Sequence, residues 1–454
     1  MRQRLRRQYY DAHCHLFNGH YLVQELLEIA RQMRRGEYEH DGLKPERANA
    51  PVLTASAAPW QAVVRTIATL HNRWKGSSAD NYQYAVSEWR ESRHQAADLL
   101  VIPLMMDIFF LLAAPQGFDV TEHPHVIPTE EEIIPLEEEA GTLQRDMLAE
   151  LKRVISEKTE FLDEMREHIG RSIKEYFARL RNRFRPPEPD VFDFDFREMF
   201  LTPGYVAQLE ELIQLQQAQR GRVFPFLAVD PRREGIADFL RDGTVVLNGH
   251  AVPVVSHQGP FYGVKIYPPL GYLPDHPVLQ QVYDFCIERD LPITTHCQPA
   301  SFYAFLFESQ QASDGVFYAH PKNWEPILTQ PRFRNLRLNM AHFGGSAAVN
   351  AYAADPDSPD AEWARWIARW MRDCPHIYTD TAALVDPEAA VAIREILARD
   401  PLVRERLLFG SDYLINLLQP ALGGDLAAFY NRFATLPEEC YTRNTQAFLH
   451  AKVE

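Results

Sequence analysis

Eight short apolar runs, most of them followed by a helical pattern, are the feature that most constrains the fold of this 454-residue chain. The runs show little alternation of apolar and polar residues, as expected for strands buried on both faces. Strands that alternate with helices imply parallel pairing through right-handed crossovers, and eight of them predict an α/β fold, a (β/α)8 TIM barrel. The runs span residues 9–17, 99–110, 222–230, 261–269, 291–299, 336–345, 376–384 and 407–414.

Three helices are predicted between the later strands. Residues 276–290 place apolar side chains near one face, and a proline stands near the start. Residues 361–374 repeat tryptophan at helical spacing, and residues 387–400 begin after a proline and are rich in strong helix formers.

Two long insertions, mainly helical, interrupt the first half of a single barrel that spans residues 1–454. Residues 18–98 separate the first two strands, and residues 111–221 separate the second from the third. Within the second insertion, the charged segment 130–184 has apolar residues near heptad spacing, which favours one or two long helices packed on the barrel or on a partner chain. Residues 185–190, RPPEPD, are expected to be a stiff linker.

Charge and cysteine content exclude several classes of protein. With 62 acidic and 47 basic residues the net charge is −15, which argues against nucleic acid or an anionic membrane as the main partner. The five cysteines form no C-x-x-C pair, so a disulfide framework is not expected. No apolar run reaches the roughly 18 residues of a membrane span. We expect a cytoplasmic protein that binds a small molecule.

The first predicted strand ends in the sequence DAHCHLF, which contains His13 and His15. Residues i and i+2 of a strand point to the same face, so both imidazoles are expected to face the barrel interior. The carboxyl ends of barrel strands hold the active site in this fold. Two imidazoles on one face make half of a metal site.

Three other predicted strands also end in a polar residue. His296 ends the fifth strand, His342 the sixth and Asp412 the eighth. Burying such groups without partners costs several kcal/mol, and a divalent cation would satisfy them together. Four histidines and one aspartate form a ligand set that suits Zn²⁺ and also accepts Mn²⁺ or Fe²⁺.

Together these segments resemble the amidohydrolase superfamily, in particular its amidohydrolase-2 group. The resemblance covers the eight strand segments but not the two insertions. It implies that the H-x-H pair, the histidines of strands five and six, and the aspartate of strand eight bind the metal; these match His13, His15, His296, His342 and Asp412. It also implies that Asp412 takes a proton from water at the metal, and that His342 or His296 orients the substrate.

Lys265, in the sequence GVKIYPPLGY of the fourth strand, leaves two interpretations open. In binuclear amidohydrolases a lysine of this strand is carboxylated and bridges two metals, and the sequence resembles that of dihydroorotases. Amidohydrolase-2 members often have G-x-K here with a single metal, which favours a cationic lysine that pairs with a substrate carboxylate or a nearby acid. The site is thus expected to hold one ion, or two if Lys265 is carboxylated.

Two further residues are expected near the site. Asp380, on the seventh strand, either supports a metal-binding histidine or caps the local structure. Tyr267, after the fourth strand, is expected to line the pocket.

Three functions remain open from the sequence. The first is a metal-dependent hydrolase that acts on an amide, lactone or ester with Asp412 as the base. The second is a metal-dependent, non-oxidative decarboxylase of an aromatic or unsaturated acid, since the amidohydrolase-2 group includes such enzymes. The third is an inactive barrel that serves as an interaction scaffold. The insertions are long enough to complete a neighbour's site, so a homo-oligomer is also open.

Overall fold

A computed structural model of the protein describes residues 7–16, 76–107, 192–193, 202–247, 249–299, 312–418 and 425–449. Within these residues the main sheet has the strand order β11-β10-β9-β8-β7-β4, and all of its pairs are parallel. The α/β class and the parallel pairing predicted from the sequence are therefore confirmed. The strands are β4 (Phe226–Ala228), β7 (Gly263–Ile266), β8 (Ile293–His296), β9 (Leu338–Ala341), β10 (Ile377–Asp380) and β11 (Leu407–Leu408).

The first two predicted strands form a separate parallel pair, β1 (Arg7–Cys14) and β2 (Ala97–Pro103). Isolated bridges connect this pair to the segments at both edges of the larger sheet. Cys14 pairs with Tyr413, which follows β11, and Leu104 pairs with Phe226 at the start of β4. A further bridge joins Val101 to Val223.

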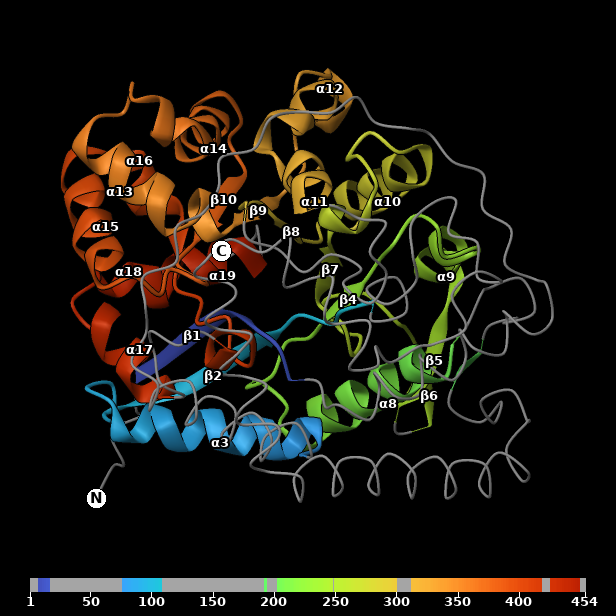
Figure 1. The fold of residues 1–454 in the computed structure, drawn as a ribbon. Coiled ribbons are helices and arrows are strands. Elements are labelled where there is room, and N and C mark those ends of the chain that lie inside the picture. Colours follow the sequence, from blue (N-terminus) through green and yellow to red (C-terminus); the bar gives the residue numbers. More distant parts are fainter. Residues whose placement is uncertain are drawn as a thin grey trace, which may run out of the picture.

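Helices follow the later strands of the main sheet, and Figure 1 shows them grouped outside it, with α3 running along the β1–β2 pair. The three helices predicted from the sequence are present as α10, α14 and α15, each within two residues of its expected bounds. The helices are α3 (Ser78–Glu91), α8 (Pro203–Ala218), α9 (Ile236–Asp242), α10 (Pro277–Glu288), α11 (Ala312–Ala319), α12 (Glu325–Leu328), α13 (Ser346–Ala354), α14 (Glu362–Asp373), α15 (Pro387–Arg399), α16 (Pro401–Arg406), α17 (Leu426–Phe433), α18 (Glu438–Tyr441) and α19 (Arg443–Leu449).

Local chemistry explains where these helices begin. Pro277 and Pro387 occupy first-turn positions, where a missing N–H costs nothing. The side chains of His276 and Asp386 accept hydrogen bonds from the backbone N–H groups of Val278 and Glu388. The N-terminal ends of these two helices are thereby capped.

Every residue of β7, β8, β9 and β10 is buried. This burial on both faces explains why the sequence of each strand lacks alternation. It also means that any polar side chain on these strands lies inside the protein and needs an internal partner.

The strands are shorter than the apolar runs suggested. β9 ends at Ala341 and β11 at Leu408, so His342 and Asp412 lie in the segments that follow the strands. Both residues have positive φ angles, 72° and 56°, which a continuing strand cannot contain. The backbone turns at these residues, and the turn directs their side chains.

An antiparallel sheet of β3 (Phe192–Asp193), β5 (Thr244–Leu247) and β6 (His250–Pro253) was not predicted. Its β5–β6 hairpin contains the sequence Asn-Gly at 248–249, which is a strong short-range hairpin signal, and Gly249 has φ +79°. The predicted helical segment 130–184 lies outside the described residues, as does most of the insertion 18–98.

None of the helices that the structure describes combines the length and the apolarity needed to cross a bilayer.

Candidate metal centre

His13 and His15 lie at the carboxyl end of β1 with their side chains almost fully buried. Nδ1 of His13 lies 2.9 Å from Oδ2 of Asp380, and Nδ1 of His15 lies 2.8 Å from the carbonyl oxygen of Leu104. Since both partners are acceptors, each Nδ1 carries a proton, and in a neutral imidazole this leaves the lone pair on Nε2. The two Nε2 atoms lie 3.5 and 3.3 Å from the same oxygen, Oδ1 of Asp412.

A protonated His13 would turn its contact with Asp412 into an ion pair, but its surroundings oppose this. Burial, and then the charge of Lys265, lower the pKa of His13 well below its ordinary value. Its Nε2 is buried and has no hydrogen-bond partner. A lone pair therefore faces a carboxylate oxygen across 3.5 Å with no proton between them, an arrangement that a cation would stabilise.

Asp380, the last residue of β10, has both carboxylate oxygens occupied. Oδ2 accepts hydrogen bonds from His13 Nδ1 and from Asn339 Nδ2, and Oδ1 accepts from the backbone N–H groups of His342 and Ala382. It lies close enough to His13 and His342 to form a second possible ligand group. Because four donors already occupy its oxygens, Asp380 is less suited to bind a metal than the other possible ligand group. That group is His13, His15 and Asp412, whose ligand atoms lie within 4.8 Å of one another.

His296 and His342 face each other beside this group. Nδ1 of His342 lies 3.1 Å from the carbonyl oxygen of Ala382, and Nε2 of His296 lies 3.2 Å from that of Gln298. The nitrogens that remain, Nε2 of His342 and Nδ1 of His296, are 3.0 Å apart. Two lone pairs at this distance repel unless a proton or a cation lies near them. Burial, followed by the charges of His296 and His13, lowers the pKa of His342 well below its ordinary value, which disfavours the proton.

Asp412 is buried and is held by its own backbone, whose N–H donates to the carbonyl oxygen of His13 at 2.8 Å. Burial raises the pKa of its carboxyl group, whereas the neighbouring His15 and the charge of Lys265 lower it. A carboxyl group with a raised pKa accepts and returns a proton more readily near neutral pH than an exposed one.

Gly410 allows the segment before Asp412 to approach β1. A Cβ atom at this position would lie 2.7 Å from Cβ of His13 and 3.3 Å from Cβ of Ala382. Only glycine fits between these two side chains without displacing them.

Lys265 lies on β7 and is 2% exposed. Its Nζ has no hydrogen-bond partner, and no carboxylate of the described residues lies within ion-pair distance. Burial lowers its pKa to about 8, although Asp412 and Asp380 act in the opposite direction. The nearby acid that one interpretation assigned to Lys265 is therefore not in contact with it.

Tyr267 follows β7 and lies beside the histidines. Its ring centroid is 4.7 Å from that of His296, and Nζ of Lys265 lies 5.7 Å from it. The backbone N–H of Tyr267 donates to the hydroxyl oxygen of Tyr272 at 2.6 Å, which fixes the turn that carries it. All the residues selected from the sequence thus lie in one region of the structure.

Asp11 was missed by the sequence analysis. It is buried, and it accepts hydrogen bonds from the backbone N–H and the hydroxyl of Ser411 and, at 3.3 Å, from the N–H of His13. Burial raises its pKa to about 7. Its spacing of two residues from His13 was an available signal, because it places the carboxyl group on the same face of β1.

The buried ion pair of Arg233 with Asp107 was also missed. Two hydrogen bonds of 2.7 Å join these residues, which are 126 positions apart in the sequence. No local pattern indicates a pair at such a separation, so only the folded structure reveals it.

Comparison with known proteins identifies the family. The model of the amidohydrolase family matches residues 182–440, more than half of the chain. The chain therefore belongs to this family of metal-dependent enzymes, as the sequence analysis expected. The matched range includes Lys265, His296, His342, Asp380 and Asp412, but it begins after His13 and His15.

No curated protein matches the sequence significantly. Among solved structures, 5-carboxyvanillate decarboxylase from Sphingomonas paucimobilis is 15% identical, with a TM-score of 0.35 over 54% of this chain and 72% of that one. A second 5-carboxyvanillate decarboxylase, from Novosphingobium aromaticivorans and complexed with manganese, is 12% identical, with a TM-score of 0.34 over 54% and 69% of the two chains. A putative 2-pyrone-4,6-dicarboxylic acid hydrolase from Pseudomonas putida is 15% identical, with a TM-score of 0.35 over 54% and 78%.

Proposed function

We propose that this protein is a metal-dependent hydrolase of a small organic substrate, with His13, His15 and Asp412 as the core of the metal site. The observation that carries the proposal is the convergence of two imidazole Nε2 atoms on Oδ1 of Asp412, at 3.5 and 3.3 Å. Each imidazole is held from behind by an acceptor at its Nδ1. Such outer contacts fix the tautomer and the ring orientation of metal-binding histidines.

The proposed architecture is a closed eight-stranded barrel. The bridges of Cys14 to Tyr413 and of Leu104 to Phe226 support it, because they join the β1–β2 pair to both edges of the larger sheet. Closure accounts for the position of His13 beside Asp380 and Asp412, which come from the opposite end of the chain.

We propose His296 and His342 as further ligands or as groups that orient the substrate. Their facing nitrogens, 3.0 Å apart, suit one shared cation or one shared proton. A set dominated by imidazole favours zinc over magnesium or calcium, and zinc is the ion that we propose.

A bound divalent cation supplies Lewis acidity and lowers the pKa of a coordinated water to about 7. Asp412 is the group that we assign to the proton. As a carboxylate it accepts the proton of the attacking water, and as a carboxylic acid it donates that proton to the leaving group. Its burial raises its pKa, which suits a group that both accepts and returns a proton.

Lys265 supports two roles at this site. As an ammonium group without a partner, it binds a carboxylate of the substrate. As a neutral amine, which its pKa of about 8 makes accessible, it reacts with carbon dioxide to form a carbamate, whose oxygens would hold a second ion. Tyr267 is placed to line the substrate pocket beside it.

Non-oxidative decarboxylation of an aromatic or unsaturated acid is the second candidate function. The buried Nζ of Lys265 supports this reaction as well as hydrolysis, since an ammonium group without a hydrogen-bond partner is suited to grip the carboxylate of such a substrate. In this reaction Asp412, in its protonated form, would deliver a proton to the carbon that loses carbon dioxide.

The first test is metal content per protomer, measured by elemental analysis on protein grown with bicarbonate and without chelator. One equivalent supports a single-ion site, and two equivalents that fall to one in Lys265→Met support the carbamate. Less than about a tenth of an equivalent, with zinc supplied, contradicts the proposal. Lys322→Met, an exposed lysine outside the site, is the matched control.

Activity separates the two reactions. A panel of lactones, amides and esters is followed by proton release, and a panel of aromatic acids by release of carbon dioxide. Turnover that depends on the metal in the first panel supports hydrolysis, and turnover only in the second supports decarboxylation. Turnover that survives complete metal removal contradicts both.

A further inference from the structure

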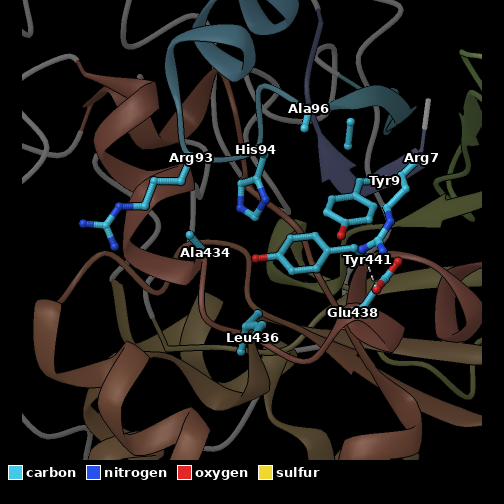
Figure 2. A pocket seen from close by; sticks show the side chains of 10 residues that line it. Arg7, Tyr9, Arg93, His94, Ala96, Ala434, Leu436, Glu438 and Tyr441 are labelled. Atoms are coloured by element: carbon cyan, nitrogen blue, oxygen red, sulfur yellow. Dashed lines mark hydrogen bonds and ion pairs between the residues drawn. The ribbon is translucent and has the colours of Figure 1, made fainter. Parts of the chain in front are cut away.

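A cavity lies at the opposite end of β1 and β2 from the metal centre. It has a volume of about 310 Å³ and is lined by residues from the start of both strands and from the region of α18. Figure 2 shows the rings of Tyr9, His94 and Tyr441 gathered around it, with Leu436 below them. A hollow of this size falls at the lower end of the range of small-molecule sites.

Aromatic rings form one wall of this cavity. Tyr9 and Tyr441 stack with their centroids 5.1 Å apart, and His94 lies 4.9 Å from Tyr441 in a tilted arrangement. Behind His94, the indole of Trp89 stacks on the imidazole at 4.5 Å. Each ring is thereby held in place before a ligand arrives, so the wall offers a planar guest a rigid apolar surface.

His94 gives the cavity a hydrogen-bond acceptor. Its side chain contacts the backbone of Tyr430, but Nε2 is buried and has no hydrogen-bond partner. Burial lowers the pKa of His94 to about 4, so the imidazole is neutral at physiological pH. A neutral imidazole whose one nitrogen is engaged as a donor presents the other as an acceptor, and leaving a buried acceptor unpaired is costly.

The mouth of the cavity is open and polar. Arg7 donates a hydrogen bond of 2.9 Å to Glu438, and their side chains are 69% and 50% exposed. These two side chains neutralise each other's charge at the rim. In Figure 2 the guanidinium group of Arg93 points away from the ring cluster.

From these features we infer a second, non-catalytic binding site for a small planar aromatic molecule that carries one O–H or N–H donor, of the phenol type. The ring stacks on the aromatic wall, and the donor bonds to Nε2 of His94. Tyr9 and His13 are four residues apart on β1, about 13 Å along the strand, so the two sites share no residue. The inference does not depend on the proposed function.

The test compares phenol with toluene, which has the same ring but no donor. Binding to the full-length protein is measured by ligand-observed NMR at up to about 10 mM, with and without prior chelator treatment. We expect phenol to bind about tenfold more tightly than toluene, with a shift of the His94 Nε2 resonance and no effect of chelator. In His94→Phe the two dissociation constants are expected to become equal.

Leu436→Trp, which fills the cavity, is expected to abolish the binding of both probes. Arg90→Ala, at an exposed position of α3 that does not line the cavity, is the matched control and is expected to bind both probes like the native protein. If Leu436→Trp does not fold, as judged by its thermal transition, His94→Phe and the native Nε2 shift decide the result. The inference is overturned if phenol binding disappears with chelator or is unchanged in both cavity variants. It is also overturned if no phenol binding is detected, which would mean that the cavity holds water alone.

Discussion

The two ends of β1 are opposite environments on one short strand. At the carboxyl end, His13 and His15 are buried, held from one side and directed at a carboxylate. At the amino end, Tyr9 packs among aromatic rings, and the polar residue beside it, Arg7, is exposed and already paired. The difference teaches that the convergence of several buried polar side chains, rather than the presence of a cavity, locates the chemistry.

Removal of the Asp412 carboxylate is the largest expected effect on the carboxyl end. In Asp412→Asn we expect metal-dependent turnover of the best substrate to fall by about 10²–10⁴-fold, because the proposed base is lost. The measurement is kcat under saturating metal. Asp373→Asn, an exposed residue of α14, is the control. Retention of native turnover in Asp412→Asn would remove Asp412 from the mechanism.

Asp380→Asn tests the support behind His13. The substitution removes the charge that holds His13 Nδ1–H and leaves one of the four present donors poorly matched. We expect metal affinity, measured by competition with a chelator, to fall about 10–100-fold. Asp386→Asn changes a carboxylate that caps α15, away from the site, and is expected to leave metal affinity unchanged. If the metal affinity of Asp380→Asn equals that of Asp386→Asn, Asp380 has only a structural role.

Lys265 gives the carboxyl end a pH-dependent stability. Its folded-state pKa, about 8, lies below the ordinary value of 10.5, so the native state binds fewer protons than the unfolded chain between these values. The free energy of unfolding is therefore expected to rise with pH from 8 to 10.5, and below pH 8 the buried charge costs on the order of 3 kcal/mol. Lys265→Met should remove both the cost and the rise.

The measurement for Lys265 is urea unfolding of metal-depleted protein at several pH values from 7 to about 10. Lys322→Met, at an exposed position, should keep the rise of the native protein. A Lys265→Met variant that is less stable than the native protein at pH 7 would contradict a buried, unpaired ammonium group.

Gly410→Ala probes the contact between β1 and the segment that carries Asp412. The added Cβ would lie 2.7 Å from that of His13, so we expect a loss of about 1–3 kcal/mol in stability together with weaker metal binding. Gly221→Ala adds a methyl group with nothing within 4 Å, at φ +75°, and should cost about 1 kcal/mol without a change in metal binding. Metal binding that is equally affected in both would show a general loss of structure.

At the amino end the expected effect is the smallest and concerns stability alone. Trp89→Phe removes a hydrogen bond of 3.0 Å to the carbonyl oxygen of Ala97 and part of a buried ring. We expect thermal unfolding to report a loss of about 1–3 kcal/mol, with metal content equal to that of the native protein. Loss of metal in Trp89→Phe would break the contrast between the two ends of β1.

Much of the site could be predicted from the sequence because polar residues ended apolar runs. His296, at the end of β8, and His342, just after β9, were found in this way, and so was Asp412, although its strand ends four residues earlier. The turns at His342 and Asp412 could not be predicted, because a positive φ in a residue other than glycine depends on its tertiary contacts. The metal identity, the oligomeric state, the cytoplasmic location and the insertions stay predictions.

The sequence by itself determined the class of fold and the chemical identity of the ligands. Burial on both faces leaves a strand without alternation, and a charged or imidazole side chain at its end stands out against that background. These signals are local, so they can be recognised without knowing which strands are neighbours.

Only the tertiary structure decided which of these groups meet. It places Asp380 behind His13 across 367 residues, and Asp11 against Ser411 across 400. It also shows that Lys265 is buried and that its Nζ has no hydrogen-bond partner, whereas the sequence left two roles open for this residue. Such facts depend on distance and desolvation in the folded chain, and no local pattern of residues encodes them.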